Sequence, residues 1–120
     1  MTQEIPRDLS QLREALRQFA AERDWDQFHS PKNLASALSV EASELLEIFQ
    51  WLTEEQSRNL TPEQRAHVRE ELADVLNYLV RLADKLDVDL LDAAREKIGK
   101  NAIKYPIEKA RGSMKKYTKL

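Results

Sequence analysis

With 120 residues, the chain is long enough for one domain around a single hydrophobic core, and we treat residues 1–120 as that domain. Its 42% hydrophobic and 33% charged residues are typical of a soluble globular protein, and no apolar run approaches the ~20 residues of a membrane helix. The net charge is only −2, the absence of cysteine excludes a disulfide framework and a thiolate metal site, and an N-terminus unlike a signal peptide favours a cytoplasmic protein.

Four helices are predicted along the chain. They are expected at residues 8–24, 31–52, 62–86 and 90–104. Ser30-Pro31 and Thr61-Pro62 each place a capping side chain before a proline at the first helical position, so they indicate where the second and third helices begin. Proline is tolerated there because the first N–H groups of a helix have no intrahelical partner.

The fourth helix has a start signal and a stop signal of its own. Asp89 is a suitable N-cap, and the Tyr105-Pro106 step ends the helix because a residue before proline avoids helical geometry. No segment alternates apolar and polar residues between turn residues, so no strand is predicted. The fold class expected is all-α, with a four-helix bundle protomer.

The C-terminal segment is basic. Residues 95–120 contain nine Lys and Arg but only two Glu. The preceding residues contain the other ten Lys and Arg and nineteen Asp and Glu. We expect a basic tail at about residues 105–120, either lying against the acidic body of its own or a neighbouring subunit, or facing phosphate groups. A nucleic-acid partner is not expected because the acidic remainder would repel a polyanion.

Carboxylates interrupt the apolar faces of the second and third helices. Glu41 falls on the stripe of Leu and Ile side chains that the second helix presents, and Glu44 and Glu47 follow at intervals of three. On the third helix, Glu71 and Asp74 are also three apart among apolar residues. Buried carboxylates repel one another unless cations neutralise them, so the pattern indicates either a metal site or acidic pairs on a solvated face.

The ligand types restrict which metal this site would bind. Oxygen ligands favour Mg²⁺, with Mn²⁺ as the alternative, whereas zinc prefers histidine or cysteine. A di-iron bundle needs Glu-x-x-His on two helices, but the two histidines are His29 and His67, and the residue three before His67 is Gln64. A di-iron site is therefore disfavoured.

At these carboxylates the sequence resembles the MazG-like superfamily of all-α nucleoside triphosphate pyrophosphatases. The signature of that superfamily is Glu-x-x-Glu followed by Glu-x-x-Asp, and here it reads Glu41-Ala-Ser-Glu44 and Glu71-Leu-Ala-Asp74. Further segments resemble the dCTP pyrophosphatase branch. They include Glu22-Arg-Asp-Trp25-Asp-Gln-Phe28-His29-Ser-Pro31, Glu47-Ile-Phe-Gln-Trp51, Asp74-Val-Leu-Asn-Tyr78, and Tyr105-Pro106.

The resemblance implies an enzyme that cleaves a nucleoside triphosphate between its α and β phosphates. The expected substrate is dCTP or a modified dCTP, and the expected role is housecleaning of the nucleotide pool. Metal ligation is implied for Glu41, Glu44, Glu71 and Asp74, and the general base is expected to be Glu44 or Glu47. The resemblance also implies a homotetramer built as a dimer of dimers.

Substrate-binding residues are expected at positions that match the branch. They are Trp25, His29, Asn33, Trp51, Tyr78, Asn101, Lys104 and Tyr105. The aromatic residues would stack on the base, and the amide of Asn33 would pair with a cytosine edge or satisfy backbone near the helix start. Arg81 and Lys85 are possible phosphate partners, but a solvated face is the more common environment for such residues.

Two alternative functions remain from the sequence. The same chemistry can act on other nucleoside triphosphates, because the metal quartet does not set the base preference. A non-catalytic helical assembly module that binds nucleotide or protein is the second alternative, although a pure scaffold gains stability by replacing buried acids with apolar residues.

Overall fold

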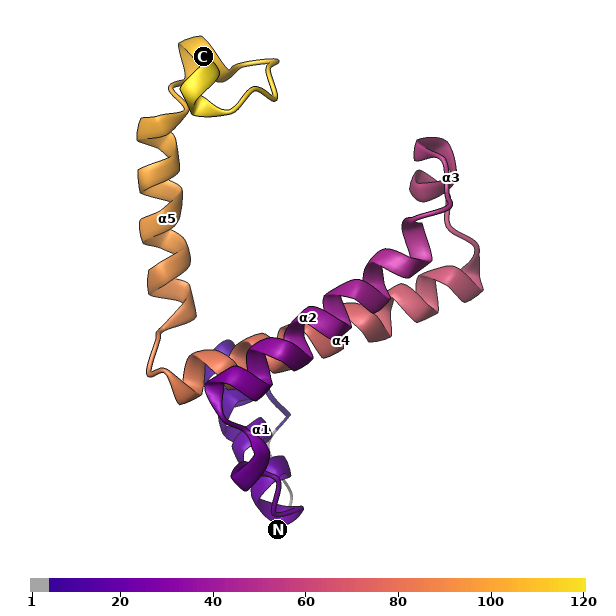
Figure 1. The fold of residues 1–120 in the computed structure, drawn as a ribbon, viewed down its shortest axis with the longest axis vertical. Coiled ribbons are helices and arrows are strands. Elements are labelled where there is room, and N and C mark those ends of the chain that lie inside the picture. Colours follow the sequence, from indigo (N-terminus) through magenta and orange to yellow (C-terminus); the bar gives the residue numbers. More distant parts are fainter. Residues whose placement is uncertain (1–4) are drawn as a thin grey trace. The chain divides into compact units, whose positions relative to one another are not determined.

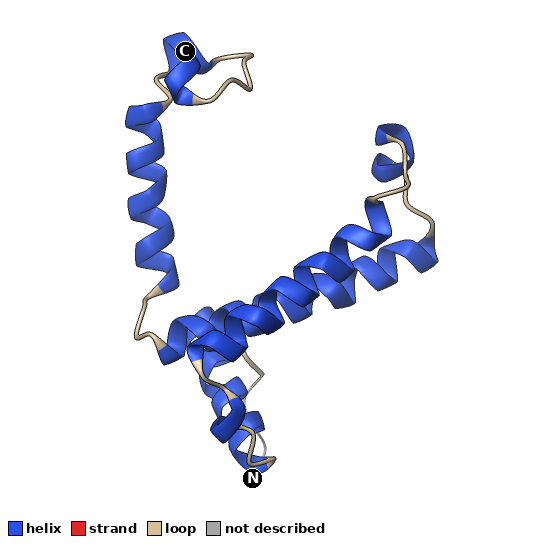
Figure 2. Ribbon diagram, viewed as in Figure 1, coloured by secondary structure: helices blue, strands red, loops and turns tan. Residues whose placement is uncertain are grey.

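The computed structural model describes residues 5–120, and all of its regular elements are helices. Of these, the residues up to Asp87 form one compact unit and residues 88–120 form a second, and the two are described separately. In the first unit the long helices are α1 (Leu9–Glu22), α2 (Pro31–Phe49) and α4 (Pro62–Lys85), and the short ones are η1 (Asp26–Phe28) and α3 (Glu54–Arg58). The second unit contains α5 (Leu90–Lys104), α6 (Ile107–Ala110) and η2 (Tyr117–Lys119) (Figures 1 and 2). The predicted all-α class with four long helices is confirmed.

The predicted caps begin the helices as expected. The Ser30 hydroxyl accepts a hydrogen bond from the Asn33 N–H at 3.2 Å. At the start of α4, Thr61 and Gln64 form a capping box in which each side chain bonds the other's backbone N–H. The carboxylate of Asp89 likewise accepts from the backbone of α5. These local bonds satisfy N–H groups that a helix leaves unpaired, which is why short sequence signals predict the starts well.

The predicted ends are less accurate than the starts. Helix α1 ends at Glu22 rather than residue 24, because Asp24 adopts a positive φ of 54° that a helix cannot accommodate. Helix α2 ends at Phe49 rather than residue 52, and a second capping box at Thr53 and Gln56 opens the unpredicted helix α3. Helix α4 ends one residue early, before Leu86, and α5 ends at Lys104 as predicted.

Helix α4 organises the first unit by packing against both α2 and α1. It runs back alongside α2 after the turn through α3, and α1 lies near its C-terminal half (Figure 1). The buried apolar side chains come from all three long helices. They are Ala20, Leu34, Val80 and Ala83. Within the described chain, no helix is long and apolar enough to cross a membrane.

Candidate functional site

Three of the predicted carboxylates meet where α2 packs on α4. Glu41 and Glu44 lie one turn apart on α2, and Glu71 approaches them from α4. One oxygen from each of these three carboxylates lies within 4.8 Å of the other two. The Glu-x-x-Glu spacing places both α2 carboxylates on the face that α4 covers, so the packing of the two helices assembles the acidic cluster of Glu41, Glu44 and Glu71.

The acidic cluster is partly buried and contains carboxylate oxygens that have no hydrogen-bond partner among the described residues. Glu71 is buried, and within the described residues the Oε2 atoms of Glu41 and Glu71 are buried without a hydrogen-bond partner. Burial, followed by a hydrogen bond that protonated Glu41 donates to the neighbouring Glu44 and by the negative charge of Glu44, raises the pKa of Glu41 to about 7. Burial and Glu44 also raise the pKa of Glu71. Lone buried carboxylates are costly, so this arrangement suits a hard divalent cation.

Asp74 and Glu47 lie beside the acidic cluster rather than within it. Asp74 is exposed one turn beyond Glu71, and its negative charge contributes to the raised pKa of both Glu41 and Glu71. Glu47 is exposed on α2, and it lines an open cavity together with Glu44 and Glu71. The structure therefore brings three of the four predicted metal ligands into one group and sets Asp74 at its edge.

A histidine that the sequence analysis did not assign to the site lines the same open cavity. The Nε2 atom of His67 lies 3.4 Å from Oε1 of Glu71, one turn earlier on α4. Its positive charge when protonated would oppose the repulsion among the carboxylates, and it contributes a lowering influence on the pKa of Glu71. The spacing of four residues between His67 and Glu71 was the signal that could have identified this pair.

Three predicted substrate-binding residues line a second cavity, of about 250 Å³, between α1, the turn before α2, and α4. Trp25, His29 and Tyr78 share its wall with Asp74 and Arg81. The Trp25 ring packs edge-on against Phe19 of α1 with 5.7 Å between ring centroids. Asp74 thus lies both on the wall of this cavity, which we name the aromatic cavity, and near the acidic cluster.

The remaining predicted substrate-binding residues lie elsewhere. The Asn33 amide donates to the Phe28 carbonyl at 2.9 Å, so it fastens the turn before α2. Trp51 follows the end of α2, is 87% exposed and does not line the aromatic cavity. In the second unit, Tyr105 packs edge-on against Tyr117, and the Lys104 ammonium lies 4.9 Å from the centroid of the Tyr117 ring. Asn101 is exposed on α5.

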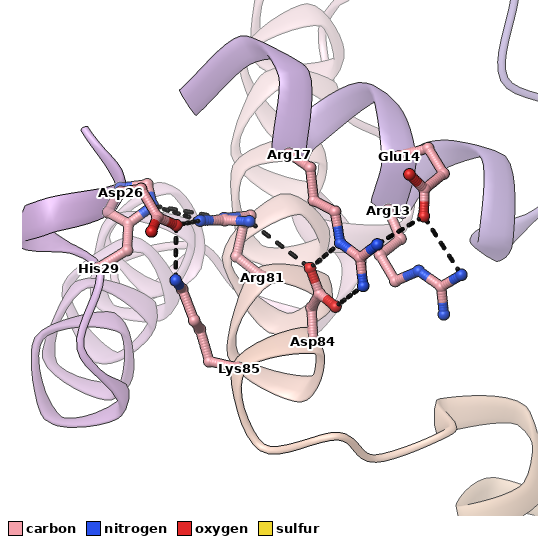
Figure 3. Close-up of polar contacts among 8 residues, drawn as sticks. All are labelled: Arg13, Glu14, Arg17, Asp26, His29, Arg81, Asp84 and Lys85. Atoms are coloured by element: carbon pink, nitrogen blue, oxygen red, sulfur yellow. Dashed lines mark hydrogen bonds and ion pairs between the residues drawn. The ribbon is translucent and has the colours of Figure 1, made fainter. Parts of the chain in front are cut away.

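Arg81 is buried, contrary to the solvated face that its position suggested. Only 5% of the residue is exposed, because its guanidinium contacts Asp26, His29 and Asp84 (Figure 3). Lys85 also contacts Asp26, at 2.5 Å, and Arg17 of α1 forms two hydrogen bonds to Asp84. We name this series of alternating charges the ion-pair ladder. Its members are Arg17, Asp84, Arg81, Asp26 and Lys85.

The ion-pair ladder lowers the pKa of both of its acids. Hydrogen bonds from Lys85 and then Arg81 hold the pKa of Asp26 below its usual value. The hydrogen bond from Arg17 does the same for Asp84. Sequence periodicity could not reveal the ladder, since Arg81 meets Asp26 across 55 residues of chain.

Comparisons with known proteins agree with this geometry. Residues 36–120 match the MazG-like family. The chain is 48% identical over 114 residues to dCTP pyrophosphatase 1 of Mus musculus and 47% identical to that of Homo sapiens, and each alignment covers 93% of this chain and 67% of the relative. The structure is similar to that of a pyrophosphatase from Archaeoglobus fulgidus, with a TM-score of 0.78 and 37% identity over 88% of this chain and 99% of the other.

The family match covers most of the chain and includes all four carboxylates of the predicted metal quartet. The relatives extend the similarity to the segment that carries Trp25 and His29, because their alignments span 93% of the chain. The chain belongs to the MazG-like family, and within it to the group that includes the dCTP pyrophosphatases.

Proposed function

We propose that this protein is a metal-dependent pyrophosphohydrolase that converts dCTP, or a modified dCTP, to dCMP and pyrophosphate. The observation that carries the proposal is the acidic cluster, in which Oε2 of Glu41 and Oε2 of Glu71 are buried without a partner among the described residues. A scaffold has no use for such oxygens, because apolar side chains of similar volume would be more stable. The similarity to dCTP pyrophosphatases supplies the substrate class.

The donor set fits Mg²⁺, with Mn²⁺ as the alternative. Glu41, Glu44 and Glu71 would hold the cation, and we retain Asp74 as a fourth ligand from its position at the edge of the cluster. When bound, the cation supplies neutralisation of the triphosphate charge and polarisation of the phosphoryl group. The carboxylates must be ionised to serve as ligands, so the raised pKa of Glu41 favours binding at neutral to basic pH.

A carboxylate in or beside the acidic cluster would act as general base and accept a proton from the attacking water. The reaction adds water across the phosphoanhydride bond between the α and β phosphates, and the water must lose a proton. Glu47 is exposed and lines the same open cavity as Glu44, so these two carboxylates are the candidates for the general base. We favour Glu47, because Glu44 is already committed to the cation.

The aromatic cavity would hold the base. Trp25 and Tyr78 offer flat rings, on which a base stacks with a gain of about 1–3 kcal/mol. Asn33 fastens the turn that carries His29, and it remains a proposed contact of the base edge. Asn101, Lys104 and Tyr105 are proposed phosphate contacts, since an amide, an ammonium and a phenol hydroxyl can each donate a hydrogen bond to a phosphate oxygen.

We also propose that the site is completed by another copy of the chain, in a homotetramer. Large apolar side chains on α2 and α4 are exposed, which is costly for an isolated chain. They include Val40, Leu46, Leu72 and Leu76. Trp51 is 87% exposed and lies away from the aromatic cavity of its own chain, so a neighbouring copy is the natural place for its ring. Sedimentation equilibrium tests the mass, and a monomer would contradict this part.

Pyrophosphate release from a panel of ordinary and 5-modified nucleoside triphosphates, with Mg²⁺ and with chelator, tests the function. Magnesium-dependent turnover that is highest for cytosine nucleotides is expected, and Glu41→Gln should abolish it. Glu54→Gln is the matched control, because the Glu54 side chain is 91% exposed and lies outside the acidic cluster. If well-folded protein turns over no nucleotide, the proposal of an enzyme is overturned, and the non-catalytic assembly module becomes the better explanation.

A further inference from the structure

His29 faces a side chain that can only donate hydrogen bonds. The guanidinium of Arg81 approaches Nδ1 of His29 with Nε at 3.3 Å and Nη2 at 3.1 Å (Figure 3). A guanidinium has five N–H donors and no acceptor, and it stays charged in proteins. Nδ1 must therefore be the acceptor, which leaves the single proton of a neutral imidazole on Nε2.

The surroundings of His29 keep the imidazole neutral. Burial, followed by the charges of Arg81 and Lys85, lowers the pKa of His29, while Asp26 has the opposite influence. The carboxylate of Asp26 is already engaged by Lys85 and Arg81. A second proton on Nδ1 would point directly at the guanidinium, so contact geometry and electrostatics favour the same protonation state.

Arg81 is itself held firmly enough to select one tautomer. Its guanidinium is almost fully buried and lies between Asp26 on one side and Asp84 on the other, at 3.1 and 3.6 Å. Asp84 is in turn engaged by Arg17 of α1. Rotating Arg81 away from His29 would break both ion pairs, and the pair with Asp84 is buried on both sides.

The second ring nitrogen of His29 makes no hydrogen bond within the described residues. Among the groups of residues 5–120, none pairs with Nε2, and His29 lines the cavity beside Trp25 and Tyr78. We propose that Arg81 is a positioning residue that fixes His29 as the Nε2–H tautomer, so that the cavity presents one permanent hydrogen-bond donor to an acceptor on the nucleobase. Cytosine offers two neighbouring acceptors, its ring nitrogen N3 and its carbonyl O2. This inference rests on the proposed function for the identity of the base.

The tautomer can be observed without any turnover. Nitrogen-15 NMR of labelled histidine distinguishes a pyrrole-type from a pyridine-type ring nitrogen, and the chain contains only His29 and His67, so His67→Ala assigns the signals. We expect Nδ1 of His29 to be pyridine-type and Nε2 to carry the proton. In Arg81→Met the two tautomers should mix. A proton on Nδ1 in the unmodified protein would overturn the proposal, and this measurement decides it even if every Arg81 variant is unstable.

A double-mutant cycle separates positioning from direct contact with substrate. Arg81→Met and His29→Ala should each weaken dCMP binding, and raise KM for dCTP, by about tenfold, as expected for one aligned hydrogen bond. The double variant should be no weaker than His29→Ala, because Arg81 acts through His29. Additive effects would instead make Arg81 a direct ligand and overturn the inference.

Matched controls guard against general electrostatic and folding effects. Arg81→Met leaves Asp84 bonded to Arg17 and Asp26 bonded to Lys85, so no acid of the ion-pair ladder loses its last partner. Arg65→Met removes an exposed cation of the same helix that lines neither the aromatic cavity nor the open cavity beside the acidic cluster, and it should leave dCMP binding within about twofold. Arg81→Lys should restore part of the affinity. If the protein binds dCMP but turns over no nucleotide, the proposed function is refuted and the inference about His29 stands. If dCMP does not bind, the role of His29 as a hydrogen-bond donor to the base is overturned.

Discussion

Helix α4 contributes residues to both the acidic cluster and the ion-pair ladder, and the two groups accommodate charged side chains in opposite ways. In the ladder, each acid contacts a base from another element, and the pKa of Asp26 and of Asp84 is lowered. In the cluster, like charges meet, buried oxygens lack partners, and the pKa of Glu41 rises to about 7. The charges of the ladder are paired within the chain, whereas the carboxylates of the cluster have the oxygen donors that suit the cation of the proposed function. We infer that the ladder stabilises the fold around the aromatic cavity, and that the cluster serves the proposed reaction.

The largest expected effect follows from breaking the acidic cluster. Glu71→Gln should reduce kcat/KM for dCTP at least about a hundredfold, because even indirect supports of a metal ligand cost 10–100-fold when removed. Circular dichroism should show an unchanged fold. Pyrophosphate release at saturating Mg²⁺ measures the effect, and turnover within tenfold of the unmodified protein would show that Glu71 is not a ligand.

Breaking the ion-pair ladder should change stability instead. Asp84→Asn removes the negative charge that Arg17 and Arg81 share and replaces one of its two acceptor oxygens with a donor, and the Asp84 side chain is only 10% exposed. We expect a loss of about 2 kcal/mol in the free energy of unfolding by urea titration. Asp92→Asn is the control, because its pair with Arg95 is exposed on both sides and such pairs contribute little. Equal losses in the two variants would contradict the distinction.

The two regions also differ in how far the sequence predicted them. Helix starts followed from local signals such as Thr61-Pro62, and the acidic cluster followed from Glu41 interrupting an apolar stripe. Both depend on spacing within one helix. The burial of Arg81 depends on Asp26, far away in the chain, so periodicity within α4 gave no indication of it. Asp74 illustrates a second limit, since spacing placed it one turn from Glu71 but could not show that it lies at the edge of the cluster.

Metal binding should sharpen the contrast through its dependence on pH. Saturating Mg²⁺ is expected to raise Tm by roughly 5 °C at pH 8, because a ligand that binds only the folded state stabilises it. The rise should shrink below pH 7, where Glu41 takes up a proton that competes with the metal. Scanning fluorimetry across pH 5.5–8.5 checks this. A rise in Tm that is independent of pH would contradict the role of Glu41.

The smallest expected effect concerns stability in chelator. The pKa of Glu41 is higher in the folded state, at about 7, than the ordinary value of 4.5, so the folded protein holds a proton that the unfolded chain has lost between those pH values. Stability from this group therefore falls as pH rises from 4.5 to 7, whereas stability from Asp84, whose folded pKa is lowered, is lost only as pH falls into the acid range. At pH 8, Glu41→Gln should consequently be more stable than the unmodified protein by roughly 1 kcal/mol, which raises its Tm by a few degrees. At pH 4 the two proteins should have the same Tm. Glu54→Gln should match the unmodified protein throughout. If Glu41→Gln is less stable at pH 8 in chelator, the carboxylate stabilises the fold and the acidic cluster is structural rather than a site that awaits a cation.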